Sequence, residues 1–359
     1  MNIPKPSASG AAPAVSVIIV TKNRDVSLKT VSLPSLARQV FKDFEVIVWD
    51  ASPGEESREV VGAFAAATPG VSVRYAKALR AGIASQRNDS VETARGEIVF
   101  FIDDDSEVSP DGLGSLIEMF SDDPALAGGC LPLDYRWPEE SGETAPPGVL
   151  YSFLVKRYWR LFIGQEEGGR FIRSYGAGPS RFPKEEGPID HLWGCDMAFR
   201  RRAIEGRRFE ERLQRYTGTA IEEDDLFSHL LYREGFKMRI AKRGLVIHRA
   251  APGNRFGSPF NDSRVHAYNS ALFWRKGVFP FNRGSLFSFL WVRAGVFGFM
   301  LLRAAHRPWQ RERWQIVSGY ARGFAAFLIH DMFAHTALEA ANLTRPLAAD
   351  GPGYSNAAD

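Results

Sequence analysis

The sequence is poor in the features that define several broad protein classes. Its 359 residues include only two cysteines, Cys130 and Cys195, and their spacing is that of neither a metal-ligand motif nor a redox motif. That scarcity fits a reducing compartment. The formal net charge is only +3, so nucleic acid is not an expected partner. No internal repeat of fixed period occurs. Residues 1–14 lack the apolar run of a secretory signal, and we expect them to be a flexible leader.

What is present is an ordinary globular composition, with 45% hydrophobic and 24% charged residues. Apolar segments separated by segments of helical spacing predict four strands, at 15–20, 44–49, 71–75 and 97–102, of which the second and the fourth are buried. This alternation is typical of an α/β fold with a mostly parallel sheet and right-handed crossovers. Further on, the pattern predicts a turn and strand at 191–201, a helix that ends before Gly235, and strands at 236–240 and 245–248.

Three consecutive aspartates, Asp103, Asp104 and Asp105, follow the most strand-like segment of the chain. Ligands of open α/β sheets bind outside the carboxyl ends of the strands. Carboxylates clustered there repel one another unless a cation lies among them, and Mg²⁺ and Mn²⁺ prefer oxygen ligands. The cluster therefore indicates a divalent metal site, with a solvated acidic turn as the alternative.

Several short motifs occur in an order that resembles the family 2 glycosyltransferases, which are inverting enzymes of the GT-A fold, and in particular those that build bacterial surface glycans. The resemblance covers residues 15–275 and depends on these segments together: 21–24, Asp50, 80–82, 86–88, 101–105, 194–201, and a Glu-Asp pair twelve residues before Gly235. It implies a GT-A domain with a nucleotide-sugar half at 15–125 and an acceptor half at 126–275.

The resemblance also implies which residues bind the nucleotide-sugar donor. Asp50 corresponds to a residue that accepts hydrogen bonds from the base, although a turn carboxylate is the alternative. Arg80 and Arg87 would lie near the diphosphate, where guanidinium groups match phosphate oxygens, unless Arg80 is a plain surface cation. The full donor set implied is Thr21, Asn23, Arg24, Asp50, Arg80, Gly82, Arg87, Asn88, Asp103 and Asp104.

The metal and the catalytic base are implied in the same way. Asp105 is the firmest metal ligand, Asp103 faces the ribose or the metal, and His248 is a third candidate, unless it is a structural histidine. Asp224 is the expected base, with Glu223 beside it. The neighbouring acids at 222 and 225 leave the register open, and an acidic helix N-terminus is the alternative explanation.

The C-terminal part has a different character. Residues 264–322 contain ten lysines and arginines against one acid, Glu312, a local net charge of +9. Residues 286–302 are apolar but short for a membrane span, and Arg293 lies in the middle. We expect a helical extension at 276–345 that binds anionic membrane at the inner face of the cell membrane, followed by a disordered tail at 346–359. An ordinary buried helix with a basic exterior is the alternative.

These features favour a metal-assisted transferase that moves a sugar from a nucleotide-diphosphate sugar to a hydroxyl of a glycan or lipid-linked acceptor. Three other functions stay open. A sugar nucleotidyltransferase would need a glycine-rich phosphate loop, which residues 21–24 do not provide. A phosphotransferase would use an aspartate nucleophile after a strand. A catalytically dead, membrane-docked scaffold would not need Asp105 and Asp224.

Overall fold

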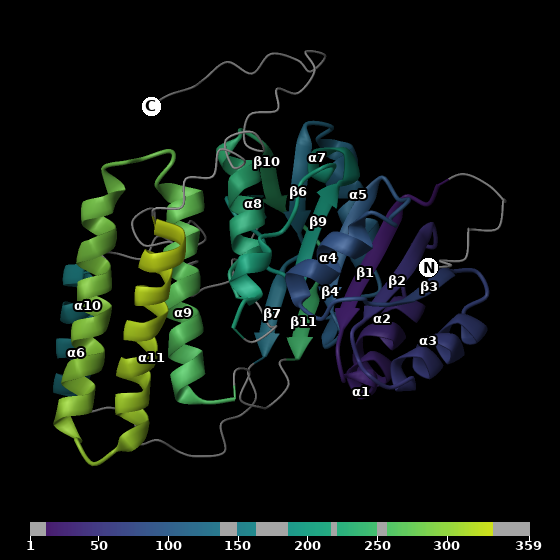
Figure 1. Ribbon diagram of the computed structural model, residues 1–359. Coiled ribbons are helices and arrows are strands. Elements are labelled where there is room, and N and C mark those ends of the chain that lie inside the picture. The colour runs from purple at the N-terminus through teal and green to yellow at the C-terminus, as the bar shows by residue number, and fades with distance from the viewer. Residues whose placement is uncertain (1–11, 137–148, 163–185, 217–220, 250–256, 333–359) are drawn as a thin grey trace.

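The computed structural model describes residues 12–136, 149–162, 186–216, 221–249 and 257–332. A twisted sheet with helices on both faces forms one part, and a group of long helices stands beside it (Figure 1). The predicted α/β class is confirmed, and so is the mostly parallel character of the sheet. The predicted leader lies mostly outside the described residues, and the predicted tail lies wholly outside them.

The main sheet has eight strands in the order β3-β2-β1-β4-β9-β6-β10-β8. The first four are parallel neighbours, as the alternation predicted. The strand β9 runs antiparallel to both β4 and β6, a reversal that the local pattern did not indicate. The strands are β1 (Val15–Thr21), β2 (Phe44–Asp50), β3 (Ser72–Lys77), β4 (Ile98–Asp103), β6 (Leu126–Cys130), β8 (Gly187–Pro188), β9 (Asp196–Arg200) and β10 (Lys237–Ile240).

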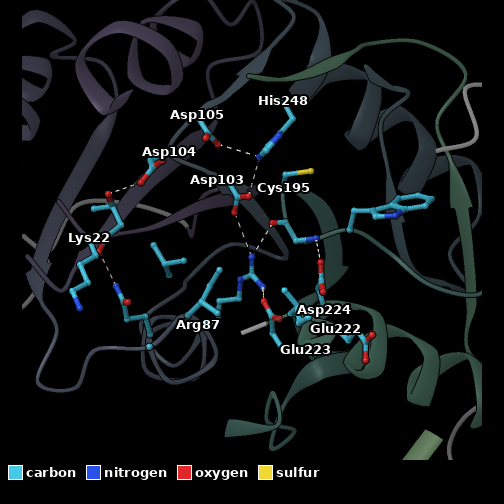
Figure 2. A pocket seen from close by; sticks show the side chains of 18 of the residues that line it. Lys22, Arg87, Asp103, Asp104, Asp105, Cys195, Glu222, Glu223, Asp224 and His248 are labelled. Carbon is cyan, nitrogen blue, oxygen red and sulfur yellow. Dashed lines mark hydrogen bonds and ion pairs between the residues drawn. The ribbon is translucent and has the colours of Figure 1, made fainter. Parts of the chain in front are cut away.

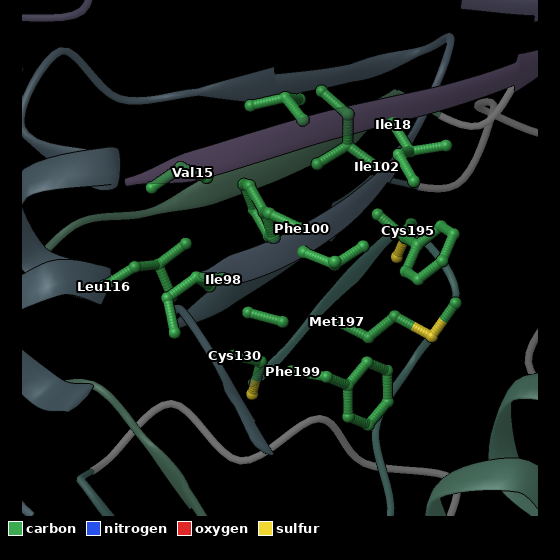
Figure 3. Packing of buried hydrophobic residues seen from close by; sticks show 14 of the residues in the cluster. Val15, Ile18, Ile98, Phe100, Ile102, Leu116, Cys130, Cys195, Met197 and Phe199 are labelled. Carbon is green, nitrogen blue, oxygen red and sulfur yellow. The ribbon is translucent and has the colours of Figure 1, made fainter. Parts of the chain in front are cut away.

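The central strands are apolar because helices cover both faces of the sheet. Phe100 and Ile102 of β4 and Met197 and Phe199 of β9 pack into one core (Figure 3). All four side chains are no more than 1% exposed. This core makes the carboxyl end of β4 a rigid platform for the aspartates that follow.

Helices connect the strands of the sheet, and α8 ends before Gly235 as predicted. Before α2, the residues Leu28–Ser32 form a π-helical turn (η1). The helices are α1 (Asp25–Ser27), α2 (Leu33–Ala37), α3 (Glu56–Ala67), α4 (Ile83–Val91), α5 (Gly112–Asp122), α7 (Arg201–Ile204), the 3₁₀ turn η2 (Glu211–Gln214) and α8 (Glu223–Arg233).

A second, three-stranded sheet has the order β5-β11-β7. It consists of β5 (Ser106–Val108), β11 (Val246–Arg249) and β7 (Leu133–Arg136). His248 pairs in register with Ser106, the residue that follows the three aspartates. This pairing brings a histidine that lies far along the chain next to the end of β4.

The long helices α9, α10 and α11 stand side by side, next to the sheet (Figure 1). Their shared core includes Tyr268, Trp274, Phe289 and Phe327, and it extends to Leu226 of α8. The predicted domain boundary after residue 275 falls inside this packed unit, because α9 packs against α11. The elements are α6 (Val149–Phe162), α9 (Pro259–Phe273), η3 (Trp274–Val278), α10 (Ser285–His306), α11 (Arg311–Phe327) and η4 (Leu328–Met332).

Helix α10 is long and apolar enough, by length and composition alone, to cross a membrane. One of its faces packs on the protein, since Phe289 and Val292 are each 1% exposed. Arg293 points to the same side and donates a hydrogen bond from Nη1 to Ser270 Oγ of α9 (2.5 Å). The opposite face exposes Phe287, Leu290 and Trp291. The helix is thus amphipathic in its packing, although its composition is nearly all apolar.

Candidate functional site

A cavity of about 520 Å³ opens at the carboxyl ends of β1 and β4. Ten of the predicted site residues line it: Thr21, Arg24, Gly82, Arg87, Asp103, Asp104, Asp105, Glu223, Asp224 and His248. Figure 2 shows the aspartates and His248 on one side, the acidic run of α8 on the other, and Arg87 between them. The two acidic groups predicted from segments far apart in the sequence therefore share one cavity.

Asp104 and Asp105 are held by the loop after β1. Arg24 forms ion pairs with both carboxylates, at 2.8 Å from Nε to Asp104 Oδ1 and through Nη2 to Asp105. Thr21 Oγ1 donates a hydrogen bond to Asp104 Oδ2 (2.6 Å). Burial raises the pKa of Asp104 to about 7, although Arg24 works against the shift. Arg24 thus partly neutralises the aspartate cluster.

His248 contacts the other aspartate oxygens. Its Nε2 lies 3.3 Å from Asp103 Oδ2 and 3.1 Å from Asp105 Oδ1, and Tyr135 stacks on its ring with a centroid distance of 4.4 Å. Burial alone would lower the pKa of His248, but the hydrogen bonds to both aspartates outweigh it and raise the pKa to about 9. The two carboxylates therefore stabilise a positive charge at the position of the His248 ring.

The donor groups at this corner fit a divalent metal ion. Asp103 and Asp105 offer carboxylate oxygens and His248 an imidazole nitrogen, and all three point at one another (Figure 2). One atom each from Asp103, Cys195 and His248 lie within 4.8 Å of one another. Cys195 was not predicted as a site residue. Burial raises the pKa of its thiol well above the ordinary value, and Asp103 adds to the shift.

The four acids at the start of α8, Glu222 to Asp225, have different partners. Asp224 Oδ2 accepts a hydrogen bond from the backbone N–H of Gly194. Asp225 Oδ1 lies 3.9 Å from His191 Nε2, and the half-buried Glu222 interacts electrostatically with Arg293. Glu222 has a positive φ of 70°, an uncommon conformation for a residue with a Cβ. The start of α8 is therefore held in one specific backbone arrangement.

Glu223 pairs with Arg87 rather than with solvent. Arg87 Nη1 lies 2.6 Å from Glu223 Oε1, and Nη2 lies 3.4 Å from Asp103 Oδ1. Nη2 also donates a hydrogen bond to the carbonyl oxygen of Gly194 (3.1 Å). Burial and the nearby Asp224 raise the pKa of Glu223, and Arg87 opposes the shift. Arg87 thereby connects the two acidic groups and the loop before β9.

Four predicted donor-binding residues do not line the cavity. Asp50 is fully buried and accepts hydrogen bonds from Ser52 and Tyr75, the latter at 2.7 Å. Arg80 is exposed and pairs with Glu211 (2.7 Å), and Asn88 binds the backbone N–H and carbonyl of Phe209. Asn23, with a positive φ of 56°, donates its N–H to Ser52 Oγ (2.7 Å). Their role in donor binding stays a prediction.

The cavity is also lined by residues that the sequence analysis did not select: Lys22, Gln86, Tyr135, Trp193, Cys195, Glu222, Asp225 and His266. Lys22 and Gln86 lie inside motifs that we had recognised, so the motifs themselves could have indicated them. Gln86 Nε2 donates to the carbonyl oxygens of Thr21 (3.0 Å) and Trp49 (2.9 Å) and ties β1 to β2 at the cavity edge. Tyr135 and His266 come from segments without any motif, so no local signal could have indicated them.

Comparison with known proteins identifies one family. Residues 16–207 match the family described as “Glycosyl transferase family 2”. Among solved structures, the mannosyltransferase PcManGT from Pyrobaculum calidifontis, in complex with GDP-Man and Mn²⁺, superposes with a TM-score of 0.52 at 15% identity. The match covers 92% of each chain. At 15% identity this similarity shows a shared fold and no more.

Two curated relatives match shorter parts of the chain. The GalNAc(5)-diNAcBac-PP-undecaprenol beta-1,3-glucosyltransferase of Campylobacter jejuni is 31% identical over 120 residues, which cover 33% of this chain and 38% of the relative. EpsH of Bacillus subtilis, provisionally named a glycosyltransferase, is 27% identical over 167 residues, 45% of this chain and 47% of the relative. The matched segment thus spans less than half the length of either relative.

Proposed function

Because the chain belongs to glycosyltransferase family 2, we propose that it transfers a sugar from a nucleotide-diphosphate sugar to an acceptor hydroxyl with inversion at the anomeric carbon. One observation carries the proposal. The metal-ligand candidates Asp103, Asp105 and His248 lie across one cavity from Asp224, and Arg87 lies between the two groups (Figure 2). Inverting transfer needs this division, with the leaving group on one side and a single base on the other.

The leaving-group side carries the positive charge. Asp103, Asp105 and His248 would hold a divalent ion, Mg²⁺ or Mn²⁺, which supplies charge neutralisation to the departing diphosphate. Arg24 is within reach of the same carboxylates and Lys22 lines the cavity beside it. Both side chains are cations that suit the phosphate oxygens of a bound donor.

The acceptor side carries the base. Asp224 would accept the proton of the acceptor hydroxyl while that oxygen attacks the anomeric carbon, and the bond to the diphosphate breaks. The N–H of Gly194 orients the Asp224 carboxylate, and the Arg87–Glu223 pair keeps the neighbouring acid from competing for the same proton. Asp225 and Glu222 turn toward other partners, which favours Asp224 among the four acids.

We further propose a glycan or lipid-linked acceptor at the inner face of the cell membrane. The turn between α10 and α11 exposes large apolar and basic side chains together, and we call this surface the hairpin tip: Leu301, Leu302, Arg303, Arg307, Trp309, Arg311 and Trp314. Trp309 is 74% and Leu302 62% exposed. Aromatic and basic residues side by side suit an anionic lipid surface. The buried Arg293 favours a peripheral helix over a spanning one.

A thermal-shift panel of nucleotide-sugars tests the proposed donor site. We expect one donor to raise the melting temperature in the presence of Mn²⁺, and to lose most of this effect when EDTA replaces the metal. In Asp105→Asn the Mn²⁺-dependent part of the shift should disappear, while the melting temperature without ligands shows whether the variant is folded. A metal-dependent shift of full size in folded Asp105→Asn contradicts the assignment of that ligand.

A further inference from the structure

We propose that Cys195 is a ligand of the metal site and that its thiolate raises the affinity of the site for Zn²⁺ above the affinity that the carboxylates and His248 supply. The inference rests on the proposed metal site and adds a sulfur donor to it. The three ligand atoms from Asp103, Cys195 and His248 lie within 4.8 Å of one another, and Asp105 Oδ1 is 3.1 Å from the same histidine nitrogen. Carboxylate, thiolate and imidazole are the three ligand types that proteins use for Zn²⁺.

The loop that carries Cys195 is fixed on both sides of the cysteine. Its carbonyl oxygen accepts a hydrogen bond from Ser106 Oγ (3.2 Å), directly after the aspartates, and the N–H of Gly194 donates to Asp224. Ligand atoms around tetrahedral Zn²⁺ lie roughly 3.5 Å apart, so closing the group requires movements of about 1 Å. Rotation about the Cα–Cβ bond moves a cysteine sulfur by more than this distance while the backbone stays in place.

A sulfur ligand increases the preference of the site for Zn²⁺ over Mn²⁺ and Mg²⁺. Two carboxylates and one imidazole suit Mn²⁺ or Mg²⁺ with water and phosphate as the remaining ligands. A thiolate added to them favours Zn²⁺, and binding releases the thiol proton to solvent. Zn²⁺ held by four side chains has a closed coordination sphere, which leaves no position for the diphosphate. We therefore expect Zn²⁺ to compete with Mn²⁺-dependent donor binding.

The other cysteine provides a matched control. Cys130 is buried in the same hydrophobic core, 1% exposed against 5% for Cys195, but it is not part of the ligand group (Figure 3). Replacing either cysteine by serine removes one buried sulfur. Only Cys195→Ser should alter metal binding, so a general effect of core substitution would appear in both variants.

The test is a titration of the full chain with Co²⁺, a spectroscopic substitute for Zn²⁺, without nucleotide-sugar. The wild type and Cys130→Ser should show the near-ultraviolet absorption of a thiolate bound to Co²⁺, and added Zn²⁺ should abolish it. Cys195→Ser should lack the band and bind Zn²⁺ at least about tenfold more weakly. Cys195→Ala gives a second variant in case the serine protein does not fold.

Absence of the band in the wild type, or its persistence in folded Cys195→Ser, overturns the assignment of Cys195. The proposed transferase function is judged separately, by Mn²⁺-dependent donor binding. If donor binding depends on Mn²⁺ and no thiolate band forms, only the assignment of Cys195 fails. If the band forms and no donor binds, the proposed function fails and the Zn²⁺ site stands.

Discussion

Arg87 and Glu223 form a buried ion pair with 2.6 Å between Nη1 and Oε1, across 136 residues of sequence. The two residues are 1% and 3% exposed. Arg87 belongs to the half of the domain that we expect to bind the donor, and Glu223 to the half that carries the base. The pair therefore connects the aspartates that we propose as metal ligands to the segment that carries Asp224.

Replacing one member of this pair should lower the free energy of unfolding. In Arg87→Met, Glu223 and Asp103 lose a buried partner, and removal of one member of such a pair costs about 3–5 kcal/mol. We expect a clearly lower urea midpoint. The double variant Arg87→Met/Glu223→Gln should recover part of the stability but little of the activity, because Asp103 and Gly194 still lack their contacts. A midpoint for Arg87→Met equal to that of the wild type would show that the pair does not hold the two halves together.

Gly194 is tightly enclosed by the side chains of Arg87 and Asp224. A Cβ at this position would lie 2.5 Å from Arg87 Nη2 and 2.9 Å from Asp224 Oδ2. Gly194→Ala should therefore displace the base and lower turnover on the order of 10²-fold, with donor affinity much less affected. In the control Gly62→Ala, on α3, the new Cβ meets nothing within 4 Å, and stability should rise by up to about 1 kcal/mol. Full turnover in Gly194→Ala would mean that Asp224 tolerates displacement.

His229 on α8 makes stability depend on pH. Burial lowers its pKa from 6.5 to about 4, with Asp190 acting in the opposite direction and Arg233 and His191 adding to the decrease. The unfolded chain binds a proton near pH 6.5, whereas the folded chain resists it until about pH 4. The contribution to stability is therefore complete above pH 6.5 and is lost as pH falls toward 4, by about 3 kcal/mol in all.

The measurement compares melting temperatures of the wild type and His229→Gln at pH 7.5 and pH 5. The variant should lose less stability on acidification than the wild type does, since glutamine does not titrate. Other buried acids titrate in both proteins, and their effect cancels in the difference. Equal losses in the two proteins would show that His229 is not the group responsible.

Binding to liposomes tests the hairpin tip. Arg307→Glu/Arg311→Glu should weaken binding to anionic liposomes at least about tenfold, because each basic residue near the surface contributes about 1 kcal/mol. Trp309→Ala should weaken it as well. Binding of the wild type should decrease as salt rises, since charge is screened within about 8 Å at physiological ionic strength.

Val40→Ser is the matched control for this surface, because Val40 is 76% exposed on the sheet part of the molecule. It should bind like the wild type. Equal binding to neutral liposomes at every salt concentration would indicate insertion of α10, and no binding at all would favour the ordinary helical packing that the sequence also allowed.

The sequence could identify those candidate residues whose position follows from the neighbouring residues alone. Asp103–Asp105 follow a fully apolar strand, and Glu223–Asp224 begin a helix, so their positions at element ends were predictable. Their partners were not. Arg24 and Asp105 pair across 81 residues, and Cys195 reaches Asp103 only because β9 lies antiparallel beside β4. Strand order and direction depend on the whole sheet, and local periodicity does not contain them.

In the helical part, too, the sequence does not predict the tertiary contacts. The sequence of α10 indicates apolar surface and one central cation, but it does not say which face is covered. Arg293 was expected to oppose membrane insertion on the basis of its charge. In the structure it lies buried against Ser270 and influences Glu222 at the start of α8. That connection between the helices and the acidic run depends on tertiary packing alone.

Turnover of the bound donor by Asp224→Asn tests the central claim most directly. The measurement is the release of nucleoside diphosphate, in the presence of Mn²⁺, from the nucleotide-sugar that stabilises the wild type. Asparagine keeps the shape and removes the base, so release should fall by roughly 10²-fold or more while the donor dissociation constant stays nearly unchanged. Equal release by the wild type and Asp224→Asn would contradict the assignment of the base. A wild type that binds the donor but never releases diphosphate with any glycan or lipid-linked acceptor would contradict the proposed transferase function itself.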